Sequence, residues 1–329
     1  MPAIKKLKLK LKSGLLSGLQ SDTIYGHFCW RLKEQLGENK LAEFLQCYHE
    51  EKPIFTLSNG LLEKNDVIFF SKPYYDTPLN IESNSKKERI EKFLKHKKIK
   101  TKKVITLEQL NLFLTGDTID YEASFERTEI KNLRIPKLKQ DLRISVEIDR
   151  STFSHKEGQL FSYNPFYVDD EEEQTFFIVL IKILDDEKFK SFQCEEILKS
   201  VFETGFGKKK SSGYGQFEVL ELTDYNGFKE PKETNGFLAL GNYLPSANDK
   251  IEDGYYEYNV KYGRLGESFS QGTNPFKRPI ILFQSGSCFL SKVRNNYYGR
   301  ITNQSEITDY KPFVVQFGIP FTLKFYYRV

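Results

Sequence analysis

The segment Lys6-Leu-Lys-Leu-Lys-Leu-Lys12 alternates strictly between lysine and leucine. Because successive side chains of a β-strand point to opposite faces, this pattern predicts a strand with a buried leucine face and a basic lysine face. A Gly/Ser turn follows at residues 14–18, and residues 21–36 then carry apolar side chains at the spacing of an amphipathic helix. Ser21 and Asp22 are typical of a helix N-terminus. The chain is therefore predicted to start with a strand, a turn and a helix that packs on the leucine face.

The same combination of strands and helices continues along the chain. Strands are predicted at residues 53–57, 67–71, 142–148, 175–184 and 217–222. A helix is predicted at residues 194–202, with Gly205 as its C-terminal cap. This order favours an α+β fold in which helices cover one face of an antiparallel sheet, as in ferredoxin-like (RRM-like) domains.

Two changes in composition divide the chain into domains. Residues 76–140 are polar and rich in lysine, with helices predicted at 85–95 and 107–114, so we interpret them as a large insertion. Residues 225–236 are rich in Gly, Asn and Lys and predict a linker. We therefore predict tandem ferredoxin-like domains: a first domain over residues 1–225 that carries the insertion, and a smaller second domain over residues 236–329.

Charge is unevenly distributed, although the net charge of the 329 residues is only +4. Residues 86–103 hold ten Lys/Arg against two Glu, whereas residues 169–173 are five consecutive acids. A basic patch can follow a phosphate backbone, and either patch can simply be a solvated surface. The acidic run is contiguous, which is not the pattern of converging metal ligands.

Cysteine usage and hydropathy indicate a cytoplasmic, soluble protein. The four cysteines are far apart and show no C-x-x-C spacing, so neither a zinc knuckle nor a disulfide framework is predicted. The first twelve residues alternate Lys with Leu rather than forming the apolar core of a signal peptide. No run of about 18 apolar residues is present, and no membrane association is expected.

The segment Gly205-Phe-Gly-Lys-Lys-Lys-Ser-Ser-Gly-Tyr-Gly215 predicts contact with phosphates. Its four glycines allow positive φ angles and close backbone approach, and its three lysines supply charge. The spacing of a Walker A loop is absent and the loop runs from helix to strand, which argues against an NTPase. Tyr214 is a candidate for stacking on a base or, equally, for packing on a neighbouring edge. Together these features favour single-stranded RNA as the ligand.

Several motifs resemble a known family. Ser21-Asp-Thr-Ile-Tyr-Gly26, Arg150-Ser-Thr152 followed by Glu157-Gly-Gln-Leu-Phe161, and the glycine-rich loop are similar to the RAMP superfamily of CRISPR proteins. Their order, together with Ser58-Asn-Gly60, Phe70-Ser-Lys-Pro73 and Ser285-Gly-Ser287, resembles more narrowly the subunits that cap the crRNA 5′ tag in type III-A (Csm) effector complexes. The similarity extends over nearly the whole chain.

This resemblance implies a non-catalytic crRNA-binding subunit that docks on a large polymerase-like subunit and on a RAMP backbone subunit. It implies no cofactor, no metal and no small-molecule substrate. Residues 76–140 would take the place of the family's thumb-like projection. By their positions in the motifs, the residues implied to lie near the RNA are Ser17, Ser21, Arg150, Thr152, Gly207, Lys208, Lys209, Lys210, Ser211, Ser212, Gly213, Tyr214, Gly286 and Ser287.

Catalysis is the main alternative. Related RAMP proteins are metal-independent, repeat-processing endoribonucleases, which need general acid–base residues to activate a ribose 2′-OH. His27 and His155 are the candidates for that role, although a position on the helix surface is favoured for His27. His49 and His96 are interpreted as surface residues. A third hypothesis is an RNA-binding module of another system. No serine-hydrolase motif is present, because Gly286-Ser287 lacks the G-x-S-x-G frame.

Overall fold

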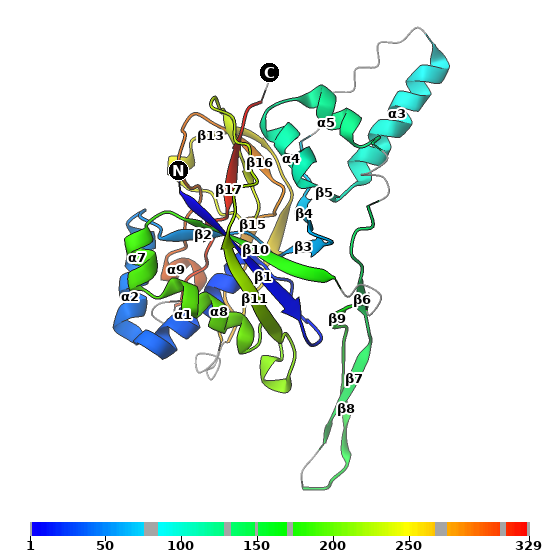
Figure 1. Cartoon of the computed structure of the whole chain (residues 1–329). Helices are drawn as coiled ribbons and strands as arrows, with labels where there is room; N and C mark the ends of the chain where they lie inside the picture. Colours follow the sequence, from blue (N-terminus) through cyan, green and yellow to red (C-terminus); the bar gives the residue numbers. More distant parts are fainter. Residues whose placement is uncertain are drawn as a thin grey trace.

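The computed structural model describes residues 2–75, 85–127, 133–148, 151–169, 174–266, 275–309 and 314–327. It combines helices with antiparallel sheets, so the predicted α+β class is confirmed. Two sheets form the body of the molecule, and several thinner segments project from it (Figure 1). A shared apolar cluster, with Ile178 and Leu180 from one sheet and Leu238 and Leu323 from the other, packs the two sheets together.

The first sheet contains the strand predicted from the Lys-Leu alternation. Its order is β11-β1-β10-β3-β4-β5, with β2 also paired to β10, and the pairs between these strands are antiparallel. The strands are β1 (Ala3–Leu11), β2 (Phe55–Leu57), β3 (Leu61–Lys64), β4 (Val67–Ser71), β5 (Val104–Ile105), β10 (Thr175–Ile183) and β11 (Phe217–Asp224). The central strand β10 is buried along nearly its whole length, as its continuous apolar run predicts.

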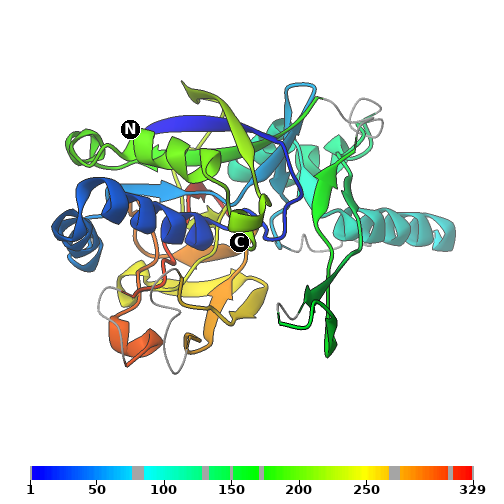
Figure 2. The same cartoon turned by 90° about the horizontal axis from the view of Figure 1, so that it is seen from below.

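Helices cover the leucine face of this sheet. They are α1 (Ser21–Leu36), α2 (Glu38–His49), α7 (Asp186–Ser191) and α8 (Cys194–Glu203). Leu7 and Leu9 of β1 are fully buried in one cluster with Phe28 of α1 and Val201 of α8. In Figure 2 these helices lie along one side of the sheet, with α1 and α8 next to each other. Gly205, with φ +93°, follows the end of α8 as predicted.

The lysine face predicted for strand β1 is openly basic only toward its C-terminal end, because Lys10 and Lys12 are exposed whereas Lys6 and Lys8 are largely covered. Lys6 and Lys8 are only 19% and 14% exposed, and their ammonium groups lie 3.6 and 2.5 Å from the carboxylate of Glu63. Glu63 is itself buried on the neighbouring part of the sheet, in β3. The alternation of the strand was predicted correctly, but the buried carboxylate of Glu63 pairs with Lys6 and Lys8.

The second sheet has the order β13-β16-β12-β17, again antiparallel. Its strands are β12 (Gly236–Ala239), β13 (Ile251–Tyr255), β16 (Cys288–Ser291) and β17 (Thr322–Phe325). A separate hairpin pairs β14 (Tyr258–Lys261) with β15 (Ile280–Phe283). The helical elements in this part are small: the 3₁₀ turn η3 (Ala247–Asp249) and α9 (Gln304–Ile307).

The predicted insertion is only partly separate from the body. Helix α4 (Leu107–Leu114) begins with a capping box at Thr106 and buries Leu110 and Leu114 in the cluster between the two sheets. By contrast, the basic helix α3 (Lys86–Thr101) projects outward (Figure 1). Helix α5 (Thr118–Ser124) lies beside α4.

A long hairpin follows and extends the projecting region beyond residue 140. Strands β7 (Arg143–Ile148) and β8 (His155–Tyr163) pair with each other, as do β6 (Leu138–Gln140) and β9 (Phe166–Val168) at the base (Figure 1). The strand predicted at 142–148 exists, but it belongs to this arm and not to the main sheet. Among the helices in the described ranges, none is long and apolar enough to cross a membrane.

Candidate nucleic-acid interface

Helix α1 has two opposite faces. Its core face carries Ile24, Tyr25, Phe28 and Leu32, all fully buried. At about 100° per residue, a second stripe within an arc of about 120° lies opposite them. This stripe consists of Thr23, Gly26, His27, Trp30 and Lys33. Helix α1 therefore attaches to the sheet by one face and presents a polar, aromatic face on the other side.

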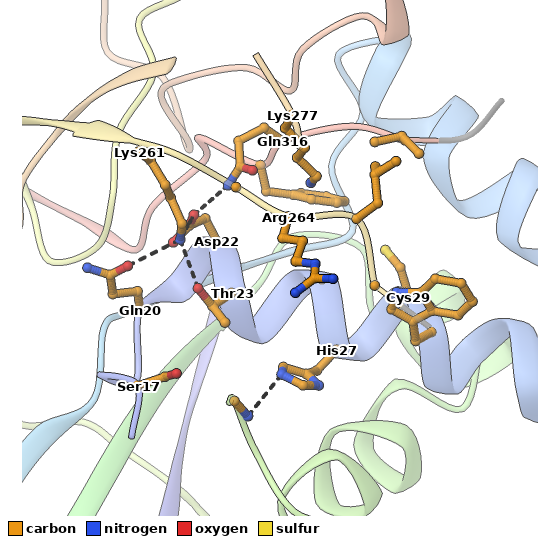
Figure 3. A pocket seen from close by; sticks show the side chains of 18 of the residues that line it. Ser17, Gln20, Asp22, Thr23, His27, Cys29, Lys261, Arg264, Lys277 and Gln316 are labelled. Carbon is orange, nitrogen blue, oxygen red and sulfur yellow. Dashed lines mark hydrogen bonds and ion pairs between the residues drawn. The ribbon is translucent and has the colours of Figure 1, made fainter. Parts of the chain in front are cut away.

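The second face lines a cleft of about 660 Å³. The turn at residues 16–18 and the glycine-rich loop bound the cleft on one side, and residues 261–266 and 314–317 bound it on the other (Figure 3). Its cationic side chains are Lys33, Lys208, Lys210, Lys261, Arg264 and Lys277, and Asp22 is the acidic residue among the lining residues that the structure describes. Such an excess of positive charge in a concave site attracts anions.

Asp22 ties α1 to three residues from the C-terminal third of the chain. Its buried carboxylate accepts hydrogen bonds from Asn242 Nδ2, at 2.8 Å, and from Gln316 Nε2, and it forms an ion pair with Lys261. Figure 3 shows Lys261 and Gln316 converging on this carboxylate. Asp22 thus holds together the segments that line the cleft. It also neutralises the charge of Lys261 through an ion pair within the chain.

Lys277 is a second cation of the cleft that is partly buried. Its Nζ donates to the carbonyl oxygen of Val315 at 3.3 Å. Burial, with a contribution from the nearby charge of Lys261, lowers the pKa of Lys277 to about 8, although Asp22 acts in the opposite direction. A phosphate close to this ammonium would favour its charged form.

The glycine-rich loop needs its glycines for backbone reasons. Gly205, Gly207, Gly213 and Gly215 have φ values of +93°, +81°, +85° and +67°, a region that other residues rarely adopt. A Cβ atom on Gly215 would lie 2.0 Å from the carbonyl oxygen of Phe206. The loop therefore folds tightly on itself around the buried Phe206 ring.

Two hydrogen bonds hold this loop against the cleft. The N–H of Gly207 donates to Nε2 of His27 at 3.1 Å, and the N–H of Lys208 donates to the hydroxyl oxygen of Ser17 at 3.1 Å. His27 was predicted to be a surface residue or a catalytic candidate, and here it supports the loop from α1. Ser17, Gly207, Lys208 and Lys210 all line the cleft, so the structure brings these four predicted residues together.

Lys209 and Tyr214 point elsewhere, toward the projecting hairpin. The Lys209 ammonium lies 3.6 Å from the centre of the Tyr163 ring, and the Tyr214 ring meets Tyr163 edge-on at 5.6 Å. Hydrogen bonds with Ser145 and Tyr214 lower the pKa of Tyr163 to about 8, and Lys209 contributes further. Tyr214 thus packs on a neighbouring ring, and its side chain stays partly exposed.

The other predicted residues lie outside the cleft. Ser211, Ser212 and Gly213 form the exposed end of the loop. Thr152 is exposed in the connection between β7 and β8, where its hydroxyl is 2.8 Å from that of Ser154. Arg150 lies outside the described residues.

Three of the residues implied to lie near the RNA, Ser21, Gly286 and Ser287, are buried within the chain itself. The hydroxyl oxygen of Ser21 accepts a hydrogen bond from the N–H of Asn242, so Ser21 joins α1 to the segment that follows β12. Ser287 donates to the carbonyl oxygen of Gln284 within the turn before β16. Gly286, with φ +101°, packs against the backbone of Lys72 in the same region. These motifs form internal contacts.

Sequence reasoning missed the other half of the site. Trp30 and Lys33 could have been found, because they share a helical face with Thr23 and His27. Lys261, Arg264 and Lys277 carry no local signal, since they reach the cleft only when their segments fold against α1. Within the described part of the chain, no three His, Cys, Asp or Glu side chains are grouped to hold a metal ion.

Comparison with known proteins places these observations in context. No family model matches the chain. The curated CRISPR system Cms protein Csm4 of Methanocaldococcus jannaschii is 26% identical over 193 residues, which is 55% of this chain and 49% of that protein. The chain thus matches about half the length of this relative.

Two solved structures have a fold similar to this chain over nearly its full length. The Csm3-Csm4 subcomplex of a type III-A CRISPR-Cas interference complex matches with TM-score 0.61 and 18% identity, covering 98% of this chain and 99% of the matched chain. A Csm1-Csm4 cassette in complex with pppApA matches with TM-score 0.58 and 14% identity, covering 99% of both chains. The resemblance to Csm-type RAMP proteins that the motifs predicted is therefore confirmed, in sequence over part of the chain and in fold over nearly all of it.

Proposed function

We propose that this chain is a non-catalytic, crRNA-binding subunit of a type III-A CRISPR interference complex that grips the single-stranded, repeat-derived 5′ tag. The observation that carries the proposal is the basic cleft between α1, the glycine-rich loop and the second domain. Lys208, Lys210 and Arg264 would meet phosphates there, while the glycines let the RNA backbone come close. A concave site of this volume suits individual unpaired nucleotides better than a duplex.

The sheet topology supports tandem ferredoxin-like domains as the framework of this function. In the first domain the order β11-β1-β10-β2 corresponds to strands four, one, three and two of a ferredoxin-like unit. The order β17-β12-β16-β13 repeats the same arrangement in the second domain with much smaller helical elements. We assign the domains to residues 1–225 and 236–329, with the insertion starting near residue 76.

Docking to a large polymerase-like subunit and to a RAMP backbone subunit is part of the proposal. The structurally similar chains come from a Csm3-Csm4 subcomplex and from a Csm1-Csm4 cassette. In this chain the projecting hairpin exposes Ile144, Phe153 and Leu160, at 60%, 87% and 68%. Apolar side chains this open to solvent are typical of surfaces that a partner covers. A cytoplasmic complex without membrane association would suit this role.

The loop lysines test RNA binding directly. We expect the double variant Lys208→Ala, Lys210→Ala to weaken binding of single-stranded RNA and to reduce the slope of log K against log salt by about 1.4, or about 0.7 for each lost phosphate contact. Lys209→Ala is the matched control, because Lys209 packs on Tyr163 and does not line the cleft. An unchanged slope in the double variant would remove the loop from the RNA site.

The RNA identity and the absence of catalysis need separate measurements. A tagged chain purified from its host should carry RNAs that share one repeat-derived 5′ end, together with a large polymerase-like protein. Random RNA without stable partners would overturn the assignment.

Incubation of the purified chain with repeat RNA and EDTA should leave the RNA intact. Cleavage that disappears in His155→Ala or His27→Ala would instead establish the endoribonuclease alternative.

A further inference from the structure

Gly26 occupies an unexpected position in the middle of α1. Among the helices that the structure describes, it is the one glycine inside an α-helix. Glycine is unfavourable there relative to alanine because it loses more backbone freedom on folding. A Cβ atom on Gly26 would meet nothing within 4 Å. Neither a left-handed backbone nor internal packing explains this residue.

The space next to Gly26 belongs to the cleft. Gly26 lines it together with Thr23 on the preceding turn and Trp30 on the following one. Glycine on a binding surface lets a ligand approach the backbone more closely than any side chain would allow. This position therefore indicates that something outside the chain packs on the helix at Gly26.

The surroundings of Gly26 identify the chemistry of that ligand. Trp30, the one tryptophan in the chain, is only partly buried at the wall of the cleft and can offer an aromatic surface. The ammonium of Lys33 lies 5.9 Å from the centre of its ring. Lys208 approaches the cleft from the glycine-rich loop, and Figure 3 shows the Arg264 side chain extending toward α1. An aromatic surface beside several cations matches a nucleotide, which has a flat base and a charged phosphate.

We propose that the face of α1 between Thr23 and Trp30 seats one unpaired nucleotide of the bound RNA, with the base stacked on Trp30 and the sugar-phosphate backbone crossing the helix at Gly26. The proposal rests on the RNA-binding function proposed above, and it names the point of closest contact. Phosphates on either side of this nucleotide would face Lys208 and Arg264. Gly26 is thus a positioning feature that keeps the path of the strand open.

The decisive test is a substitution whose effects on stability and on binding have opposite signs. Gly26→Ala should raise the melting temperature by about 1–2 °C, because alanine is the better helix former and its methyl group meets no atom. The same change should weaken binding of a short single-stranded RNA by about threefold, and Gly26→Leu should weaken it by about tenfold or more. A glycine without a ligand contact would give the gain in stability with unchanged binding, and that result would overturn the proposal.

Trp30 supplies a site-specific readout because the chain holds a single tryptophan. Short single-stranded RNA should quench its fluorescence, and Gly26→Leu should abolish the quenching. Trp30→Ala should weaken RNA binding by about tenfold, which is within the range for loss of one stacked base. Equal quenching by inorganic phosphate alone would mean that the cleft binds an anion without a base, and would contradict the proposed nucleotide seat. Asn39→Ala, at an exposed position of α2, is the matched helix-propensity control and should leave binding unchanged.

The outcomes separate this inference from the broader function. If the natural chain binds RNA and responds to the Lys208/Lys210 double variant but not to Gly26→Leu, the seat on α1 is wrong while the RNA-binding role stands. If the natural chain binds no RNA in isolation or in its native complex, both proposals fail.

Discussion

At the scale of single residues, Asp22 shows how the cleft acquires its positive charge. Its carboxylate is the acidic group among the described lining residues, and Lys261, Asn242 and Gln316 already occupy it. Lys33 pairs with Glu38 at 3.2 Å, and Glu38 is not one of the residues that line the cleft. Removing the partners of Asp22 would leave its buried carboxylate without a compensating charge, which is strongly destabilising. Asp22 therefore affects the stability of the protein as well as the charge of the cleft.

The lowered pKa of Lys277 leads to a prediction of pH-dependent binding. Because this pKa lies at about 8, the free protein loses the Lys277 charge between pH 7 and pH 9. Its affinity for single-stranded RNA should then fall with rising pH, by at most about tenfold for each pH unit above that value. Titrations at pH 7 and pH 9 with natural chain and Lys277→Arg test this expectation. The arginine variant keeps its charge and should lose much less affinity.

The variant Lys277→Met is the second control for this experiment. It should bind more weakly than the natural chain at pH 7 and should show little further loss at pH 9. A decline of the same size in all three proteins would assign the pH effect to the RNA or to other groups.

At the scale of elements, the glycine-rich loop is a rigid support and not merely a flexible tether. Its four glycines all have positive φ, and its backbone N–H groups at 207 and 208 are bound by side chains from α1 and from the preceding turn. The loop therefore presents Lys208 and Lys210 at a defined place. This rigidity reduces the entropy lost when RNA binds.

Gly215 and Gly213 provide a matched pair for testing this rigidity. Gly215→Ala should lower the free energy of unfolding by about 3 kcal/mol, because the methyl group collides with the carbonyl oxygen of Phe206 in addition to the strained φ. Gly213→Ala should cost only about 1 kcal/mol, since its φ is also positive but the space around it is open. Urea unfolding of both variants measures the difference. Equal costs would show that the loop relaxes freely.

At the scale of the whole molecule, the two sheets share their core. Ile178 and Leu180 of the first sheet pack with Leu238, Phe321 and Leu323 of the second in a single cluster. The backbones also meet directly: the N–H of Phe321, just before β17, donates to the carbonyl oxygen of Leu57 at the end of β2, at 2.8 Å. The cleft lies between units that stabilise each other, so its shape depends on both.

This shared core predicts that the first domain is unstable alone. A fragment of residues 1–225 would expose Ile178, Leu180 and Phe70 to water, at a cost of about 25 cal/mol for each Å² of apolar surface. We expect this fragment to aggregate or to unfold without a sharp transition, while the full chain unfolds in one cooperative step. Circular dichroism and calorimetry distinguish the two. A soluble fragment with a sharp transition would contradict the shared core.

Much of the architecture was predictable because it is encoded in local patterns. The strand of alternating Lys and Leu, the amphipathic stripe of α1, the apolar run of β10 and the helix at 107–114 all formed where periodicity placed them. The wrong predictions concern the place of a segment in the tertiary structure. The strand at 143–148 was recognised, but nothing in its alternation distinguishes a projecting hairpin from a strand of the main sheet.

The sequence by itself determined the secondary elements, the tight glycine-rich loop with its lysines and the resemblance to Csm-type RAMP proteins, since each depends on neighbouring residues. Only the tertiary structure decided which predicted residues face the cleft. It buried Ser21 and Ser287, turned Tyr214 and Lys209 toward Tyr163, and brought Lys261, Arg264 and Lys277 to α1. The reason is separation along the chain: the hydrogen bond from Gln316 to Asp22 joins residues 294 positions apart, and no local pattern of hydropathy or charge records such a contact.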